Sequence, residues 1–216
     1  MKGKLIVLDG TDGSGKKTQL DLLEKRLKKE SYRVKTIDFP RYKDSFYGKM
    51  VAKYLRGEYG DIYEANPYFV SLLYAGDRFL AKDKILDWLN KGYIVLTNRY
   101  VSANLAFQSA KLPQKEREKY LSWESELEYK INQLPEENQV IFLHVPAEIA
   151  QKLVEKRMDK KDIYDTNLTF QKNVEQQYLF LAKKFNWPII KCTKNQKILS
   201  REEIAEKIWQ NVKKYL

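Results

Sequence analysis

Two kinds of hydrophobic pattern alternate along the chain. Short stretches rich in apolar and β-branched residues, typical of buried strands, occupy residues 5–8, 33–39, 93–96, 140–145 and 188–192. Between them, longer stretches carry an apolar residue every three or four positions, which is the period of an amphipathic helix. These stretches predict helices at residues 16–29, 46–57, 67–80, 83–90, 102–108, 114–133, 147–157, 168–185 and 201–215.

Several expected helix ends carry capping residues. Gly92 follows a helix that should end at Asn90 and is a suitable C-terminal cap. Ser102 is expected to cap the helix after the third strand, and Ser200 with Glu203 forms a capping box for the last helix. Residues 157–167 are polar and charged, and they have the length of a small lid over a binding site.

Alternation of strands with helices predicts a single α/β domain over residues 1–216. It should contain a five-stranded parallel sheet with helices on both faces. We find no internal repeat, low-complexity tract or linker. Ligands of such sheets bind beside the carboxyl ends of the strands, so the residues that follow positions 8, 39 and 96 are expected to share one crevice.

A glycine-rich stretch follows the first expected strand and leads into a helix. Gly10, Gly15 and Lys16 have the spacing of a phosphate-binding loop. Glycines let backbone N–H groups wrap around an anion, and the helix N-terminus and Lys16 add positive charge. The stretch predicts a P-loop NTPase fold, and the predicted ATP-binding residues are Gly10, Thr11, Asp12, Gly13, Ser14, Gly15, Lys16, Lys17 and Thr18.

The residue after the loop lysine departs from the motif. The motif places a hydroxyl there, which reaches Mg²⁺, but this chain has Lys17, and the hydroxyl comes one place later on Thr18. Because a helix turns about 100° per residue, Thr18 does not simply replace the missing group. Thr18 is therefore expected to be a weak metal ligand.

Composition narrows the possible partners. The 216 residues include 40 Lys and Arg against 29 Asp and Glu, a formal charge of +11. The basic residues are spread over helices and turns, which suits a protein that binds phosphate esters and gives no reason to expect a nucleic-acid partner. No apolar run approaches the ~20 residues of a membrane span, and Cys192 is the only cysteine. We expect a cytoplasmic protein without a disulfide or a membrane contact.

The lone histidine weighs against hydrolase chemistry. His144 lies inside an expected strand, so no Ser-His or Cys-His nucleophile can be built around it. Two pairs of polar side chains instead point to nucleotide binding. Tyr74 and Arg78 are four residues apart on one helix, and so are Asn104 and Gln108 on another, so each pair shares a helix face. A ring can stack on a base, a guanidinium can bind a phosphate, and amides can read a base edge.

These motifs, in this order, resemble the thymidylate kinases, a family of P-loop nucleoside-monophosphate kinases. The motifs are G-x-D-G-x-G-K, F-P-R-Y, Tyr-x-x-x-Arg and N-R-Y-x-x-x-N-x-x-x-Q, and the resemblance runs from residue 4 to about residue 178. It implies transfer of the γ-phosphoryl group of ATP to dTMP, which gives dTDP and ADP. It also implies Mg²⁺ as a cofactor and a homodimer.

The resemblance also implies roles for individual residues. Asp12, Lys16 and Arg99 would be catalytic, with Asp12 at the sugar 3′-hydroxyl and Lys16 on the ATP phosphates. Tyr74 would stack on the base, which Asn104 and Gln108 would hydrogen-bond. Arg78 and Arg99, helped by Arg41, would hold the acceptor phosphate. The acceptor region would span residues 39–80, and the full acceptor set would be Asp12, Phe39, Arg41, Tyr74, Arg78, Arg99, Asn104, Gln108 and Tyr178.

Three departures from the family pattern concern the metal and the lid. The third strand ends in Asn98 where the family has Asp, and an amide is a weaker partner for Mg²⁺ than a carboxylate. Together with Lys17, this predicts a metal held weakly, through water at Thr18 and Asn98. Gly13 replaces an arginine that some members carry in the loop, and the expected lid cations are Arg157, Lys160 and Lys161.

Two other readings stay open at this point. The chain could be a P-loop kinase for another nucleotide or deoxynucleoside, although two acceptor arginines suit a monophosphate. It could also be a catalytically weak nucleotide-binding protein, as Lys17, Asn98 and the charge of +11 allow. A hydrophobic pocket separates substrates that differ by one methyl by only about 1–3 kcal/mol, so thymine and uracil are not distinguished.

Overall fold

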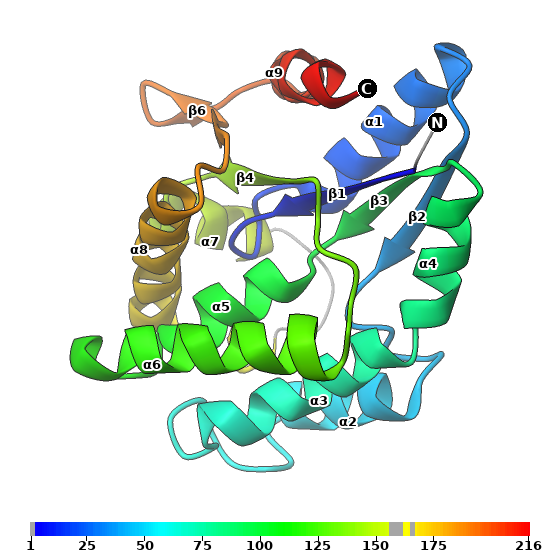
Figure 1. Ribbon diagram of the computed structural model, residues 1–216. Coiled ribbons are helices and arrows are strands. Elements are labelled where there is room, and N and C mark those ends of the chain that lie inside the picture. The colour runs from blue at the N-terminus through cyan, green and yellow to red at the C-terminus, as the bar shows by residue number, and fades with distance from the viewer. Residues whose placement is uncertain (1–2, 156–161, 165–166) are drawn as a thin grey trace.

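The computed structural model describes residues 3–155, 162–164 and 167–216. Five parallel strands form its central sheet, as predicted, and the structure shows their order to be β2-β3-β1-β4-β5 (Figure 1). Strand β1 is therefore central, and its carboxyl end lies between those of β3 and β4. The strands are β1 (Lys4–Asp9), β2 (Val34–Asp38), β3 (Ile94–Asn98), β4 (Gln139–His144) and β5 (Ile189–Lys191).

Helices connect the strands and cover both faces of the sheet. The described α-helices are α1 (Lys16–Lys29), α2 (Phe46–Leu55), α3 (Pro67–Phe79), α4 (Lys82–Asn90), α5 (Val101–Ser109), α6 (Gln114–Ser125), α7 (Ala147–Glu155), α8 (Leu168–Lys184) and α9 (Arg201–Val212). Each overlaps a stretch that the hydrophobic period predicts, and α4 and α5 extend beyond their predicted bounds by one residue at one or both ends. In Figure 1, α1 and α9 lie on one side of the sheet, and α5, α6 and α8 lie on the other.

The core consists of two layers because side chains alternate between the faces of each strand. Ile6 and Leu8 of β1 pack in one cluster with apolar residues of α1 and α9. Leu5 and Val7 pack in the other, with residues of α5 and α8. All four side chains are fully buried, and each contributes about 1.5–3 kcal/mol of hydrophobic stabilisation.

Helix ends follow the sequence signals with one exception. Ser200 and Glu203 form the predicted capping box at α9, and Gly92 takes a positive φ of 77° just after α4. Ser102 does not cap α5, contrary to the prediction. The helix begins at Val101, and the Ser102 hydroxyl donates instead to Asp9 at 2.5 Å. Because the Ser102 hydroxyl bonds the buried Asp9 carboxylate, it does not cap the N-terminus of α5.

Two local features were not predicted. The helix expected over residues 114–133 changes after α6 into a π-helical segment, Glu126–Ile131. A short antiparallel hairpin, β6 (Thr193–Lys194) and β7 (Lys197–Ile198), precedes α9. Its two turn residues, Asn195 and Gln196, both have positive φ, as the favoured two-residue hairpin turn requires.

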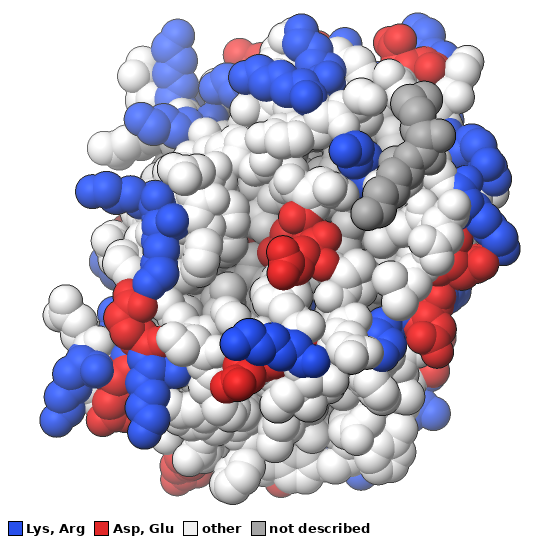
Figure 2. All heavy atoms as spheres, in the orientation of Figure 1, with Lys and Arg blue, Asp and Glu red and all other residues white. Residues whose placement is uncertain are grey.

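The positive charge is spread over the surface. On the face shown in Figure 2, Lys and Arg side chains lie mainly around the edges, and acidic side chains lie among them and near the centre. This face presents no continuous basic patch of the kind that follows a nucleic-acid backbone. Among the described helices, none is both long enough and apolar enough to span a bilayer.

Candidate active site

The glycine-rich loop joins β1 to α1. Gly15 takes a φ of +82° and forms the N-terminal cap position of α1, which turns the first N–H groups of the helix toward the loop. The Lys16 ammonium donates to the carbonyl oxygens of Gly10 at 3.0 Å and Thr11 at 2.8 Å. These contacts hold the loop as a closed turn around its lysine. The motif and its flanking elements are therefore present as the spacing predicts.

A second glycine lets a helix approach the loop. Gly13 has a φ of +82°, and a Cβ atom there would collide with the Ala150 carbonyl oxygen of α7. Gly15 has the same φ, but a Cβ there would meet nothing within 4 Å. The loop thus needs glycine at position 13 for close packing as well as for conformation. The arginine that some relatives are expected to carry there does not fit this backbone arrangement.

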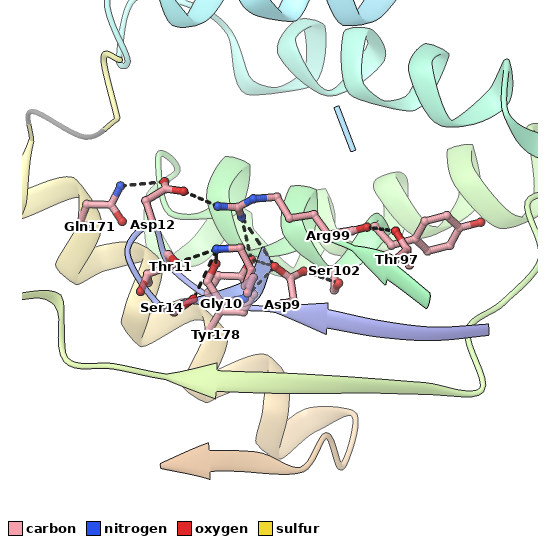
Figure 3. A network of polar contacts seen from close by, with 12 residues as sticks. Asp9, Gly10, Thr11, Asp12, Ser14, Thr97, Arg99, Ser102, Gln171 and Tyr178 are labelled. Carbon is pink, nitrogen blue, oxygen red and sulfur yellow. Dashed lines mark hydrogen bonds and ion pairs between the residues drawn. The ribbon is translucent and has the colours of Figure 1, made fainter. Parts of the chain in front are cut away.

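Asp9 is buried beneath the loop and accepts hydrogen bonds from several groups. It was not among the site residues predicted from the sequence. Its Oδ1 accepts from the Gly10 backbone N–H at 2.8 Å and from the Tyr178 hydroxyl at 2.6 Å. Its Oδ2 accepts from Ser102. Figure 3 shows how these contacts tie β1, α5 and α8 together. Tyr178, a predicted acceptor residue, is fully buried, and its hydroxyl also accepts from Arg99 Nη1 at 3.4 Å.

Arg99 and Asp12 form an ion pair at the edge of the loop (Figure 3). An Arg99 Nη2 lies 2.5 Å from Asp12 Oδ1, and Gln171 donates to the other Asp12 oxygen at 3.3 Å. Burial alone would raise the pKa of Asp12, but the charges of Arg99 and Lys16 outweigh it and hold that pKa below its usual value. Asp12 is thus a carboxylate at neutral pH, and it positions the guanidinium.

The backbone of Arg99 is itself unusual. Its φ is +64°, in the left-handed region that residues other than glycine rarely adopt. The Thr97 hydroxyl bonds the Arg99 carbonyl oxygen at 2.6 Å, and the Arg99 N–H bonds the Leu8 carbonyl oxygen at 3.1 Å. The guanidinium also lies over the Phe107 ring, 4.6 Å from its centroid. Such local strain at a strand end is a frequent mark of a functional residue.

A pocket opens beside this pair. We call it the aromatic pocket. Most of the predicted acceptor residues line it, and Arg41 and Tyr178 do not. The lining residues are Asp12, Phe39, Pro40, Tyr42, Leu55, Tyr74, Arg78, Arg99, Ala103, Asn104, Phe107, Gln108, Asp162 and Tyr164. Rings and a few convergent polar groups are the usual make-up of a small-molecule site.

A second hollow, which we call the loop cleft, adjoins the first. Asp12, Arg99, Phe39, Pro40 and Tyr42 line both of them. The other residues around the loop cleft are Gly13, Gly15, Lys16, Lys17, Asp38 and Asn98. The phosphate-binding loop and the aromatic pocket therefore meet at the Asp12–Arg99 pair.

Arg78 lines the aromatic pocket and is already paired. Its Nε donates to Glu128 at 2.8 Å, its Nη2 also contacts Glu128, and Nη1 donates to the Tyr100 carbonyl oxygen at 3.2 Å. Burial would lower the pKa of Arg78, but the carboxylates raise it, so the guanidinium stays charged. Glu124 lies 3.6 Å from Nη2. Neither glutamate was identified from the sequence.

Asn104 and Gln108 both face the aromatic pocket, as their spacing predicts. Asn104 Nδ2 donates to Glu124 at 2.7 Å, so Asn104 and Arg78 share one buried carboxylate. Gln108 Nε2 donates to the Tyr164 hydroxyl at 3.2 Å, and this brings the segment at 162–164 against α5. The predicted lid cations Arg157, Lys160 and Lys161 lie outside the described residues.

Arg41 is not among the described residues that line the aromatic pocket. Its Nε donates to Asp77 at 3.0 Å, and its backbone N–H donates to the same carboxylate at 2.7 Å. The Ser45 hydroxyl also contacts Asp77. In this arrangement Arg41 joins the segment after β2 to α3, and its predicted help on the phosphate stays a prediction.

The expected metal neighbourhood contains a carboxylate that the sequence analysis missed. Asp38 and Asn98 are register partners at the ends of β2 and β3, and both line the loop cleft, whereas Thr18 is not among its described lining residues. Lys17, the departure from the motif, lies 3.1 Å from Asp21 and 3.5 Å from the Oδ2 atom of Asp38. The ammonium thus bridges α1 and β2.

Comparisons with known proteins agree with this geometry. The sequence model of the thymidylate kinase family matches residues 8–204. Thymidylate kinase from Mycobacterium tuberculosis is 31% identical over 184 residues, 82% of this chain and 85% of that protein. The enzyme from Caldanaerobacter subterraneus is 30% identical over 209 residues, 96% of this chain and 95% of its own length.

A solved structure extends the similarity to the fold. The thymidylate kinase structure from Candida albicans superposes with a TM-score of 0.79 at 22% identity, and covers 99% of this chain and 92% of that one. The sequence matches, taken with the loop and the pocket beside it, establish the relationship: this chain belongs to the thymidylate kinase family.

Proposed function

We propose that the loop cleft binds the phosphates of ATP and that the aromatic pocket binds dTMP, with the two nucleotides meeting at Asp12 and Arg99. The observation that carries this assignment is that these two residues line both hollows. Phosphoryl transfer requires donor and acceptor in line and close together. A charged pair at the boundary between the hollows is where the transferred group would pass.

As a member of its family, the protein is an ATP:dTMP phosphotransferase. It transfers the γ-phosphoryl group of ATP to the 5′-phosphate of dTMP and releases dTDP and ADP. No observation favours a kinase for another acceptor or a catalytically weak binding protein. A nucleoside kinase, for example, has no acceptor phosphate to place beside Arg99.

Different side chains of the two hollows bind different parts of the two nucleotides. Lys16 and the loop N–H groups hold the donor phosphates. Arg99 holds the acceptor phosphate, and Asp12 positions Arg99 and accepts from the sugar hydroxyl. We place Arg78 at the base end, rather than on the phosphate, because it shares Glu124 with Asn104. Tyr74 offers its ring to the base, and burial raises the pKa of its hydroxyl well above the usual value, so it stays neutral.

Mg²⁺, which the family implies, fits two oxygen atoms of the loop cleft. Oδ1 of Asp38 and Oδ1 of Asn98 are buried, and no described residue donates a hydrogen bond to either. Both residues end neighbouring strands in register, so their side chains leave the sheet on the same face. Mg²⁺ favours one or two such ligands with water and phosphate oxygens. When bound, the ion neutralises charge on the donor phosphates.

We further propose a homodimer and a cytoplasmic location. The dimer is supported by large apolar side chains that α3 leaves exposed, among them Phe69 at 71% and Leu72 at 42% exposure. The location is supported by the single cysteine, Cys192, which is buried and free, as is usual for proteins of a reducing compartment.

The test is ADP release with each of several acceptors: dTMP, dUMP, dCMP, AMP and thymidine. We expect dTMP to be used best. Lys16→Ala should lower kcat by a factor of about 10³ or more, since a cation on the transferring phosphoryl is worth ~10³–10⁵. Arg99→Ala should chiefly raise the KM for the acceptor.

Lys29→Ala is the control because Lys29 is an exposed lysine at the far end of α1. Thermal melts confirm that each variant is folded. Full activity of a folded Lys16→Ala protein, or equal use of thymidine and dTMP, would contradict the proposal.

A further inference from the structure

We infer that Glu124 fixes the hydrogen-bonding direction of Asn104 and thereby makes the aromatic pocket select bases that carry a ring N–H. These are the imide bases, thymine and uracil, and the rejected base is cytosine. The inference rests on the proposed binding of the acceptor base at Asn104. It gives a role in specificity to a carboxylate that does not itself line the pocket.

The contacts of Asn104 leave one polar atom for a ligand. Asn104 is 2% exposed, and its Nδ2 donates to Glu124 Oε1 at 2.7 Å and to the Ser71 carbonyl oxygen at 3.4 Å. A backbone carbonyl can only accept, so chemistry identifies the atom that faces Ser71 and Glu124 as the amide nitrogen. Both amide hydrogens are thus engaged within the protein. What remains for the pocket is Oδ1, which can only accept.

An acceptor in this position distinguishes the pyrimidines. Thymine and uracil carry an N3–H, which can donate to Oδ1. Cytosine has a bare N3, whose lone pair would face the amide oxygen and leave both atoms without a partner. A site built to bond a substrate N–H rejects an analogue without it far more strongly than it rejects a missing methyl. The pocket should therefore discriminate strongly against cytosine and only weakly between thymine and uracil.

Glu124 is not needed to balance the charge of Arg78. Glu128 already forms two contacts with that guanidinium, and one carboxylate balances one cation. Glu124 is a second carboxylate, fully buried, and a buried charge without its own counter-ion is costly. Its Oε2 accepts from the Tyr120 hydroxyl at 3.1 Å, and its Oε1 accepts from Asn104. Two residues of the pocket contact Glu124: Arg78, whose Nη2 lies 3.6 Å from Oε1, and Asn104, whose hydrogen bond to Oε1 is shorter at 2.7 Å.

The contact also survives protonation of Glu124. Burial, with Glu128 nearby, raises the pKa of Glu124 to about 8. A proton on Oε2 can be donated to the Tyr120 hydroxyl, which bonds Ser71 at 2.7 Å in turn. Oε1 remains an acceptor for Asn104 in either state, so the direction of the amide is the same across the neutral range.

The experiment compares Glu124→Leu with Glu124→Gln and measures kcat/KM and Kd for dTMP and dCMP. Leucine removes the acceptor, so Asn104 can turn and present its NH₂ group. The preference for dTMP over dCMP should then fall by about tenfold or more. Glutamine can accept the same bond through its side-chain oxygen, so its preference should stay within about threefold of the wild-type ratio. Glu126→Leu removes an exposed carboxylate of the following segment and is the matched control.

The ratio of the two acceptors separates positioning from damage, because general loss of structure lowers both substrates together. A folded Glu124→Leu protein with an unchanged ratio overturns the inference. So does a Glu124→Gln protein that loses as much preference as the leucine variant, since charge would then be the cause.

If the leucine variant fails to fold, Glu124→Met replaces it, and the wild type is tested with N3-methyl-dTMP, which should bind far more weakly than dTMP. Equal binding of the two overturns the inference. A wild-type protein that binds dTMP without phosphorylating it would overturn the proposed function alone, because the Kd ratios still test Glu124.

Discussion

Glu124 should leave a thermodynamic signature as well as a specificity effect. Its pKa is raised from 4.5 to about 8 because it is buried beside Glu128. Between these values the folded protein keeps the proton and the unfolded chain loses it, so the free energy of unfolding falls as pH rises, by up to about 1.4 kcal/mol per unit. Glu124→Gln should flatten this slope. Urea denaturation at pH 5, 6, 7 and 8 measures it, and parallel slopes in the two proteins would contradict the prediction.

Substitutions at Asp38 and at Asn98 should change the affinity for Mg²⁺ in opposite directions. Asp38→Asn should weaken Mg²⁺ binding about tenfold, since loss of a supporting ligand typically costs 10–100-fold, and Asn98→Asp should strengthen it. Calorimetric titration of Mg²⁺ into the ATP complex measures both. Asp21→Asn is the control, because Asp21 also contacts Lys17 but lies away from the strand ends. Equal loss in the Asp21 and Asp38 variants would show that Lys17, and not the metal, is the cause.

Some residues of the site could not be predicted from the sequence, because they contact partners that lie far from them in the sequence. Lys16 and Arg99 are evident because their neighbours in sequence form motifs. Asp9 contacts Tyr178, 169 positions away, and Arg78 contacts Glu128, 50 positions away. No local spacing encodes such pairs. A carboxylate is recognised as a partner only when the fold has brought it to a guanidinium or a hydroxyl.

The close approach of α7 to the glycine-rich loop can be tested by placing a side chain between them. Gly13→Ala and Gly15→Ala place the same side chain at the same φ of +82°, and left-handed backbone costs each about 1–2 kcal/mol. Only Gly13→Ala also collides with the Ala150 carbonyl oxygen. It should therefore lower the free energy of unfolding by at least about 1 kcal/mol more than Gly15→Ala, because overpacking typically costs 1–3 kcal/mol. Chemical denaturation measures both, and equal losses would contradict the close approach.

Secondary structure was well predicted where hydrophobic period decides it, and less well where a polar side chain had a choice. Ser102 has the right chemistry for an N-terminal cap, but Asp9 lies within reach once β1 and α5 pack together. The π-helical segment after α6 has the same apolar pattern as a helix. One added residue in its turn changes which side chains point inward, and here Glu128 is one of the buried ones.

The overall fold could be predicted because only a few topologies are open to a chain of alternating strands and helices. Alternating strands and helices permit a parallel sheet with right-handed crossovers, and the loop after the first strand places the ligands at one edge. That reasoning brought Tyr74, Asn104 and Arg99 into one pocket, as the structure shows. It could not show that Arg78 and Asn104 contact the same carboxylate, Glu124, because such contacts depend on side-chain partners that lie far apart in the sequence.

The exposed face of α3 predicts how two copies of the chain associate. Phe69, Leu72 and Phe79 are 71%, 42% and 45% exposed, and their spacing of three and seven residues places them along one side of the helix. Large apolar side chains exposed along one side of a helix mark an interface, and a two-fold dimer pairs the same patch from both subunits. Phe69→Glu combined with Leu72→Glu should therefore yield a monomer, since facing carboxylates repel and cannot be desolvated. Light scattering after gel filtration measures the mass.

The control is Ile131→Glu, which changes an isolated residue that is 68% exposed and should leave the dimer intact. A double variant that stays dimeric, or a monomeric wild type, would contradict the assignment of this face.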